Sequence, residues 1–171
     1  MLAMRLHNLL PLALLVACDS GPSKQESAQI FGSVVTALTN GESAAIQAAP
    51  NNSPEPQLEW SGPCSLGGTL TLSGAYESGD VDTDATGSFD LRATFTGCKE
   101  AAGTLDGELR WTMASDANMY SWSMDGDLAW DGHDGSGSCA FDVSMTFSEA
   151  EVRYDGSVCG HSMTSAGAPG H

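Results

Sequence analysis

Basic side chains are scarce in this chain of 171 residues. Six Lys and Arg face 22 Asp and Glu, which gives a formal net charge of −16 at neutral pH. So acidic a domain is repelled by phosphate backbones and by anionic head groups. We therefore expect no nucleic-acid partner and no peripheral binding to anionic lipid. An acidic surface also keeps a protein domain soluble.

Signatures of catalysis are also missing. The chain has no Gly-x-Ser-x-Gly elbow, no nucleotide-binding loop and no Cys-x-x-Cys pair. His, Asp and Ser do meet between Asp131 and Ser136, but a catalytic triad needs groups that converge from separate elements. We interpret these residues as a turn and His133 and His161 as exposed loop histidines. The sequence predicts a protein that is not an enzyme and needs no cofactor.

A short apolar stretch, Leu9 to Val16, follows Arg5 near the start of the chain. It falls short of the roughly 20 apolar residues that span a bilayer, and it ends in Leu15-Val16-Ala17-Cys18, which looks like a bacterial lipobox. We expect residues 1–17 to be a signal peptide, Cys18 to be lipidated and residues 18–23 to form a tether. The alternative is an ordinary signal peptide in which Cys18 is incidental.

Lipidation at Cys18 would place the protein in the bacterial cell envelope, tied to a membrane and facing the periplasm or the exterior. One acyl chain binds a membrane only marginally, whereas two or more hold it firmly. Without the leader, 154 residues remain, and 5 basic residues minus 22 acidic ones give a net charge of −17. This length is enough for one domain.

Four cysteines follow Cys18: Cys64, Cys98, Cys139 and Cys159. An even number in an oxidising compartment indicates disulfides, and four cysteines allow three pairings. Zinc is the rival interpretation, but the long spacings do not match a typical zinc site. We therefore expect no metal at these cysteines.

The first structured segment is predicted to be helical, over residues 24–49. Ser23 and Glu26 form a capping box, and apolar residues recur behind it at helical spacing. We expect Asn40-Gly41 to stop the helix, a shorter helix to follow over 42–49, and residues 50–57 to form a linker. The apolar stripe comprises Ile30, Phe31, Val34, Val35 and Leu38.

From Leu58 onward the apolar period changes from 3.6 to 2, which predicts strands that are apolar on one side only. We expect a mainly β domain over residues 58–160 and a flexible tail over 161–171. The fold is an antiparallel up-and-down meander of about six to seven strands, strongly curled or barrel-like, with the amphipathic helix packed on it. The predicted strands cover Leu66–Tyr76, Phe89–Phe95, Leu105–Met113, Tyr120–Trp130, Cys139–Phe147 and Val152–Val158.

Three Asp-Gly pairs lie within the predicted strands, at Asp106-Gly107, Asp125-Gly126 and Asp155-Gly156, and could each mark a hairpin turn. At Asp125-Gly126 parity decides, because only a continuous strand keeps Trp122, Met124 and Leu128 on one face. Gly126 is therefore expected inside a strand, where the sheet bends or another backbone comes close.

The predicted strands also suggest how the cysteines pair. Cys64 precedes one hairpin and Cys98 ends it, while Cys139 opens the next such hairpin and Cys159 closes it. We therefore predict disulfides Cys64–Cys98 and Cys139–Cys159, each closing a loop worth roughly 3 to 4 kcal/mol in the chain-entropy model.

Four short motifs carry a resemblance over most of the chain that follows the leader: Cys64-Ser65-Leu66-Gly67-Gly68-Thr69, Phe95-Thr96-Gly97-Cys98, Gly137-Ser138-Cys139 and Cys159-Gly160. Together with the lipobox and a short helix, they resemble a group of uncharacterised bacterial lipoproteins. These motifs are structural, so the resemblance implies a Gly-punctuated meander with paired cysteines and no catalytic residue.

Asp80, Asp82 and Asp84 begin like a calcium loop, but Ala85 and Leu91 stand where an EF-hand needs Gly and Glu. A looser Ca2+ site in this loop is the alternative to a solvated acidic tip.

These observations predict a lipid-anchored, non-catalytic envelope module that acts by structure or by binding a protein partner. The alternative is a carrier that encloses an apolar or lipid-like ligand in the curled sheet. Its lining would comprise Trp111, Trp122, Trp130, Phe141 and Met145, which otherwise fill a core.

Overall fold

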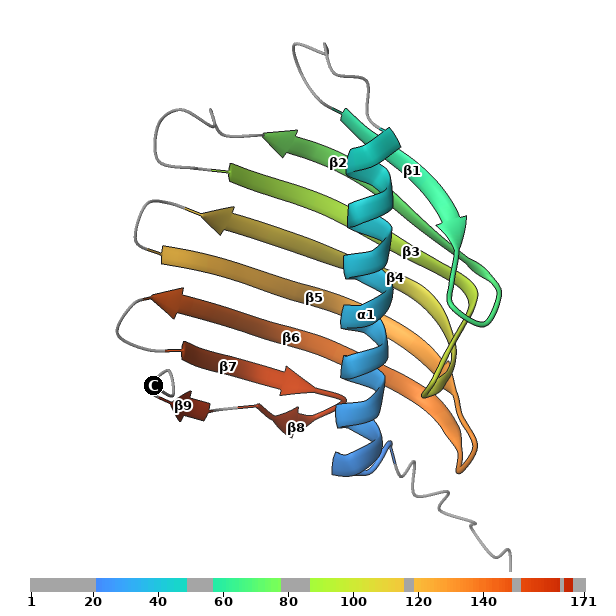
Figure 1. Cartoon of the computed structure of the whole chain (residues 1–171). Coiled ribbons are helices and arrows are strands. Elements are labelled where there is room, and N and C mark those ends of the chain that lie inside the picture. Colours follow the sequence, from blue (N-terminus) through green and yellow to red (C-terminus); the bar gives the residue numbers. More distant parts are fainter. Residues whose placement is uncertain are drawn as a thin grey trace, which may run out of the picture.

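The computed structural model of the chain describes residues 21–48, 57–77, 87–115, 119–148, 152–163 and 165–167. It consists of one long helix laid across one face of an antiparallel sheet (Figure 1). The expected class, a mainly β meander with a helix packed on it, is confirmed. The elements are α1 (Lys24–Ala48), β1 (Gln57–Pro63), β2 (Thr69–Glu77), β3 (Gly87–Glu100), β4 (Gly103–Ser115), β5 (Met119–Asp131), β6 (Ser136–Ser148), β7 (Val152–Val158), β8 (His161–Ser162) and β9 (Ser165–Gly167).

The sheet follows the chain, because strands β1 to β8 lie side by side in sequence order and β9 also pairs with β7. All six predicted strands are present as β2 to β7, and β1 and β8 extend the sheet beyond the expected number. The sheet curves around α1 (Figure 1). In the described part of the chain β1 pairs with β2 alone, so the sheet stays open and the closed barrel is not formed.

The core lies between α1 and the sheet. On the helix, Ile30, Val34 and Leu38 are buried, as the apolar stripe predicts. Fully burying such a side chain stabilises the fold by about 1.5 to 3 kcal/mol. The sheet contributes the alternate apolar residues of its inner face, among them Leu70, Leu72, Phe89, Leu91, Phe95, Leu105, Leu109, Met124, Leu128, Phe141, Val143 and Val158.

The capping box forms at the start of α1 as predicted. The Ser23 N–H donates to Glu26 Oε2 at 2.7 Å, and the Glu26 N–H donates to Ser23 Oγ at 3.3 Å. Hydrogen bonding of the Glu26 carboxyl to the side chain and to the backbone of Ser23 holds its pKa below the ordinary value. The chain therefore enters the helix at a fixed residue.

The predicted helix stop at Asn40-Gly41 is wrong, because α1 runs without a break to Ala48. Gly41 is buried and faces the sheet, where a Cβ atom would lie 2.9 Å from Leu70 Cδ2 and 3.1 Å from Trp60 Cζ3. The glycine therefore allows close helix–sheet packing, and this tertiary contact outweighs its low helix propensity.

Three further expectations differ from the structure. Leu66, assigned to the first strand, lies in the β1–β2 turn and is 68% exposed. In the expected tail, residues 161–162 and 165–167 pair with β7. His161, expected in an exposed loop, is half-buried, and its Nε2 lies 2.9 Å from the Pro22 carbonyl oxygen. This contact joins the last part of the sheet to Pro22, two residues before α1 begins.

Gly126 lies inside β5 opposite Leu109, as parity predicts, with a φ of 136°. A Cβ atom there would lie 2.5 Å from the carbonyl oxygen of Glu108. Gly107 has the same close approach to Asp127 across the β4–β5 pair. These strand glycines allow neighbouring backbones to approach and the sheet to bend.

Candidate functional site

The two predicted disulfides are present. Cys64 and Cys98 join with a Cα–Cα distance of 5.5 Å across 34 residues of sequence, and Cys139 and Cys159 join with 4.2 Å across 20 residues. Each bridge lies at one end of a hairpin, as the strand pattern predicts. The four cysteines therefore act as two clamps on the sheet.

The first clamp fixes the β1–β2 turn against the end of β3. The Leu66 N–H donates to the Lys99 carbonyl oxygen at 3.0 Å, and the Lys99 N–H donates to the Gly67 carbonyl oxygen at 2.7 Å. Together with the bridge from Cys64, these bonds hold two hairpin ends together. They also position the next residue of β3, Glu100.

Glu100 is a buried acidic side chain, with only 6% of its surface exposed. Its Oε1 accepts a hydrogen bond at 2.9 Å from the N–H of Ser65. A carboxylate oxygen of Glu100 and the sulfur atoms of Cys64 and Cys98 lie within 4.8 Å of one another. Because the two sulfurs are bonded to each other, they offer no thiolate ligands for a metal ion.

Glu100 borders two hollows along one side of α1, which we call the α1 groove. One hollow measures about 430 Å³ and the other about 290 Å³, and the carboxylate is common to both. Small side chains on the helix leave the space. The helix contributes Gln29, Gly32, Ser33, Thr36, Ala37, Asn40, Gly41 and Ala44, and the opposite wall includes Trp60, Pro63, Ser65, Leu70, Ala101 and Ala102.

The β3–β4 turn is held firmly at this groove. The Ala102 N–H donates to Ser33 Oγ on α1 at 3.1 Å, and the Trp130 Nε1–H donates to the Ala102 carbonyl oxygen at 3.0 Å. Helix, turn and β5 are thereby joined. The position of Glu100 beside α1 is therefore set by hydrogen bonds on both sides of it.

On the other side of α1 lies a second apolar surface, the aromatic shelf, formed by Phe31, Trp122, Met145 and Phe147. Phe31 stacks on Trp122 with ring centroids 6.2 Å apart, and Phe147 is 46% exposed. Met145 is half-buried. The shelf is open to solvent at Phe147, its most exposed member.

Two ionisable groups are perturbed near this end of the inner face. Burial raises the pKa of the Glu42 carboxyl. Burial and the negative charge of Glu42 both raise the pKa of the Tyr120 phenol. Tyr120 lies in β5 two residues before Trp122, so both groups belong to the region around the shelf.

The outer face of the sheet carries exposed ion pairs. Arg110 donates two hydrogen bonds to Asp90, at 2.9 and 2.7 Å, which lower the pKa of the Asp90 carboxyl. Arg92 and Glu108 lie 3.5 Å apart beside them. A shallow hollow of about 590 Å³ between these residues is lined by the pairs themselves. Exposed pairs of this kind contribute little to stability, and we interpret this face as a solvated surface.

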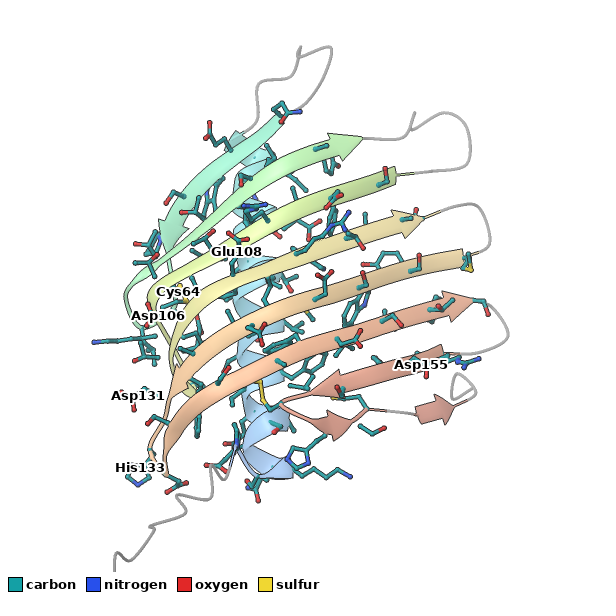
Figure 2. All side chains as sticks on the ribbon, turned by 180° about the vertical axis from the view of Figure 1, so that it is seen from behind. Cys64, Asp106, Glu108, Asp131, His133 and Asp155 are labelled. Atoms are coloured by element: carbon teal, nitrogen blue, oxygen red, sulfur yellow. A yellow bond between two sulfur atoms is a disulfide. The ribbon has the colours of Figure 1, made fainter. Side chains whose placement is uncertain are left out.

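The sequence candidates for catalysis do not converge. Residues 131–136 form the tight β5–β6 turn, closed by a hydrogen bond of 2.8 Å from the Gly132 N–H to the Gly135 carbonyl oxygen. Figure 2 shows Asp131 and His133 at the same end of the sheet as Cys64, and Asp155 toward the opposite side. His133 therefore sits in a turn, as predicted.

Several predicted sites lie outside the described residues, namely Cys18 and the calcium candidates Asp80, Asp82 and Asp84. Of the expected carrier lining, Trp111, Trp130 and Phe141 are buried in the core, whereas Trp122 and Met145 are half-buried on the shelf. Glu100 was missed at the sequence level, because a glutamate after Cys-Lys carries no pattern that marks burial.

The part of the chain that the structure describes contains no helix both long enough and apolar enough to cross a membrane. No protein-family model matches the chain, and no curated protein or solved structure shows a significant similarity to it.

Proposed function

We propose that the protein is a lipid-anchored, non-catalytic module of the bacterial cell envelope, which acts by binding. The observation that carries the proposal is the pairing of all four cysteines after Cys18 into two bridges. Disulfides persist in oxidising compartments outside the cytoplasm and are rare in cytosolic proteins. This pairing agrees with an exported chain, which is what Leu15-Val16-Ala17-Cys18 predicts.

The proposed anchor follows from the motif Leu15-Val16-Ala17-Cys18. Cleavage before Cys18 and acylation of that cysteine leave a folded domain that begins only a few residues later, at the Ser23 cap of α1. A short tether of this kind keeps the domain close to the membrane. The net charge of −17 then keeps the body of the domain off an anionic lipid surface, so the lipid alone provides the attachment.

The α1 groove supports a binding role. Its lining is mostly small or apolar, and a single buried carboxylate, that of Glu100, lies in it. Ligand sites are concave and mostly apolar, with few polar groups that fix orientation. The groove matches this description, and it is held open by a disulfide and by the Ala102–Ser33 hydrogen bond.

A carrier of apolar ligands is the second candidate, and the aromatic shelf favours it. Trp122, Met145 and Phe147 leave apolar surface exposed on the same face that α1 covers elsewhere. An acyl chain lying on the shelf would extend the hydrophobic core between α1 and the sheet. Lipid that co-purifies with the protein in native mass spectrometry would support the carrier, and its absence would leave the binding module.

Replacement of the lipidation site tests the anchor. We expect Cys18→Ser to move the protein from the membrane fraction to the soluble fraction of a bacterial host, whereas the matched variant Ser20→Ala stays with the membrane. A Cys18→Ser variant that still fractionates with membranes, at the wild-type level, would overturn the anchoring proposal.

A further inference from the structure

We infer that the α1 groove binds a linear aliphatic amine in its ammonium form, with the Glu100 carboxylate as its counter-ion. The inference rests on the proposed binding role but not on the lipid anchor.

Glu100 has no cationic partner within the described residues. Of the residues that line the two hollows, it alone is charged. One of its oxygens accepts the Ser65 N–H, and within the described stretches it takes part in none of the ion pairs, which join Arg92–Glu108, Arg110–Asp90 and Arg153–Asp155. Among the described residues no buried side-chain oxygen lacks a hydrogen-bond partner, so what the carboxylate lacks is a cationic partner. An ammonium group entering the groove would provide one through a charge-assisted hydrogen bond.

The groove also has an aromatic wall, formed by Trp60. Trp60 lines the same hollow as Glu100, and its ring lies against α1 at Gly41. A cation near the face of a tryptophan gains further attraction when water is excluded. A carboxylate together with an indole is therefore a pairing that favours an organic cation over a neutral ligand.

The groove is elongated along α1. Its helix wall extends from Gln29 to Ala44, which at 1.5 Å per residue is about 22 Å. Ala37, Leu70 and Pro63 offer apolar surface to a methylene chain. An unbranched chain with a terminal ammonium would lie along this wall with its ammonium at Glu100. The formal net charge of −16 would also attract a cationic ligand from solution.

Calorimetry on the full chain in zwitterionic phospholipid nanodiscs tests this inference. The probes are hexane-1,6-diammonium and its neutral counterpart hexane-1,6-diol, which have the same chain length. We expect the diammonium to bind with one site per chain and the diol to bind at least about tenfold more weakly, because a charge-assisted hydrogen bond is lost. Equal binding of both probes would overturn the inference and identify a merely apolar groove.

Two substitutions make the test specific. We expect Glu100→Gln to weaken diammonium binding at least about tenfold, because the amide can still accept the Ser65 N–H but carries no charge. Glu59→Gln removes the same charge from an exposed position on β1, and its effect should stay within about twofold. An unchanged affinity in Glu100→Gln, or an equal loss in both variants, would contradict the inference.

A third variant covers the case in which Glu100→Gln destabilises the fold. Asn40 is exposed on the helix and lines the hollow that Trp60 and Glu100 share, so Asn40→Met fills this hollow without changing charge or core. We expect it to weaken diammonium binding at least about tenfold, by steric exclusion. Retained binding in Asn40→Met would place the ammonium elsewhere. Membrane fractionation of Cys18→Ser reports on the anchor separately, so the two proposals can fail independently.

Discussion

Gly41 of α1 lies directly against Leu70 of β2, at a distance that leaves no room for a side chain. A Cβ atom on Gly41 would lie 2.9 Å from Leu70 Cδ2 and 3.3 Å from Leu72 Cδ1. This contact sets how closely the helix approaches the sheet, and so it shapes both the core and the α1 groove beside it.

Replacing Gly41 by leucine should therefore destabilise the protein. We expect Gly41→Leu to lower the free energy of unfolding by about 1 to 3 kcal/mol, because the added side chain overpacks the helix–sheet contact. Gly32 provides the control on the same helix, since no atom lies within 4 Å of its added Cβ. Gly32→Ala should raise stability by up to about 1 kcal/mol through helix propensity. Urea unfolding followed by circular dichroism measures both; a stabilised Gly41→Leu would contradict this packing.

Gly126 allows a second test, in the sheet. Its φ of 136° is one that L side chains rarely adopt, and an added Cβ would meet the Glu108 carbonyl oxygen. We expect Gly126→Ala to cost about 1 to 3 kcal/mol. Gly137 in β6 has open space around its Cβ, so Gly137→Ala should change stability by less than about 0.5 kcal/mol. Equal thermal unfolding of the two variants would show that Gly126 is not constrained in this way.

The capping box predicts a dependence on pH. Hydrogen bonds from Ser23 lower the pKa of Glu26 in the folded state, so the stabilisation is present above the pKa of the unfolded chain and is lost as pH falls through the folded value. Ser23→Ala should lower stability by about 0.5 to 2 kcal/mol at neutral pH. The difference between variant and wild type should shrink in acid, as the pH falls through the lowered pKa of the Glu26 carboxyl. Gln25→Ala, an exposed neighbour, should show no such convergence.

The two disulfides should stabilise the fold unequally. The loop closed by Cys64–Cys98 is longer than that closed by Cys139–Cys159, with separations of 34 and 20 residues. Replacing the first pair by serine should cost about 3.8 kcal/mol and the second about 3.3 kcal/mol in the chain-entropy model. Chemical unfolding of the two double variants compares them. If either pair could be removed without loss, the corresponding clamp would have no structural role.

Much of this architecture could be predicted from local patterns. Alternation of apolar residues located the strands from Phe89 to Val158, and strand order then indicated both cysteine pairs, because hairpin ends are neighbours in space. Parity placed Gly126 inside β5 against the usual meaning of Asp-Gly.

The errors arose where a contact distant in sequence decides the conformation. By local sequence Gly41 predicts a helix stop, but it lies against Leu70 of β2 and the helix continues. Leu66 fits the strand pattern by sequence, although it lies in the clamped β1–β2 turn. Only the Ser65 N–H and the neighbouring α1, both distant in sequence, mark Glu100 as a buried polar residue. Neither local spacing nor composition reports such neighbours, so the groove could not be predicted.

The most direct test of the account is the intact mass of protein made in a bacterial host, before and after reduction. We predict a chain that begins at Cys18, is heavier than residues 18–171 by its acyl groups, and gains four hydrogens when the two bridges are reduced. An unacylated chain that retains residues 1–17, or one in which Cys64, Cys98, Cys139 and Cys159 are free thiols, would contradict it.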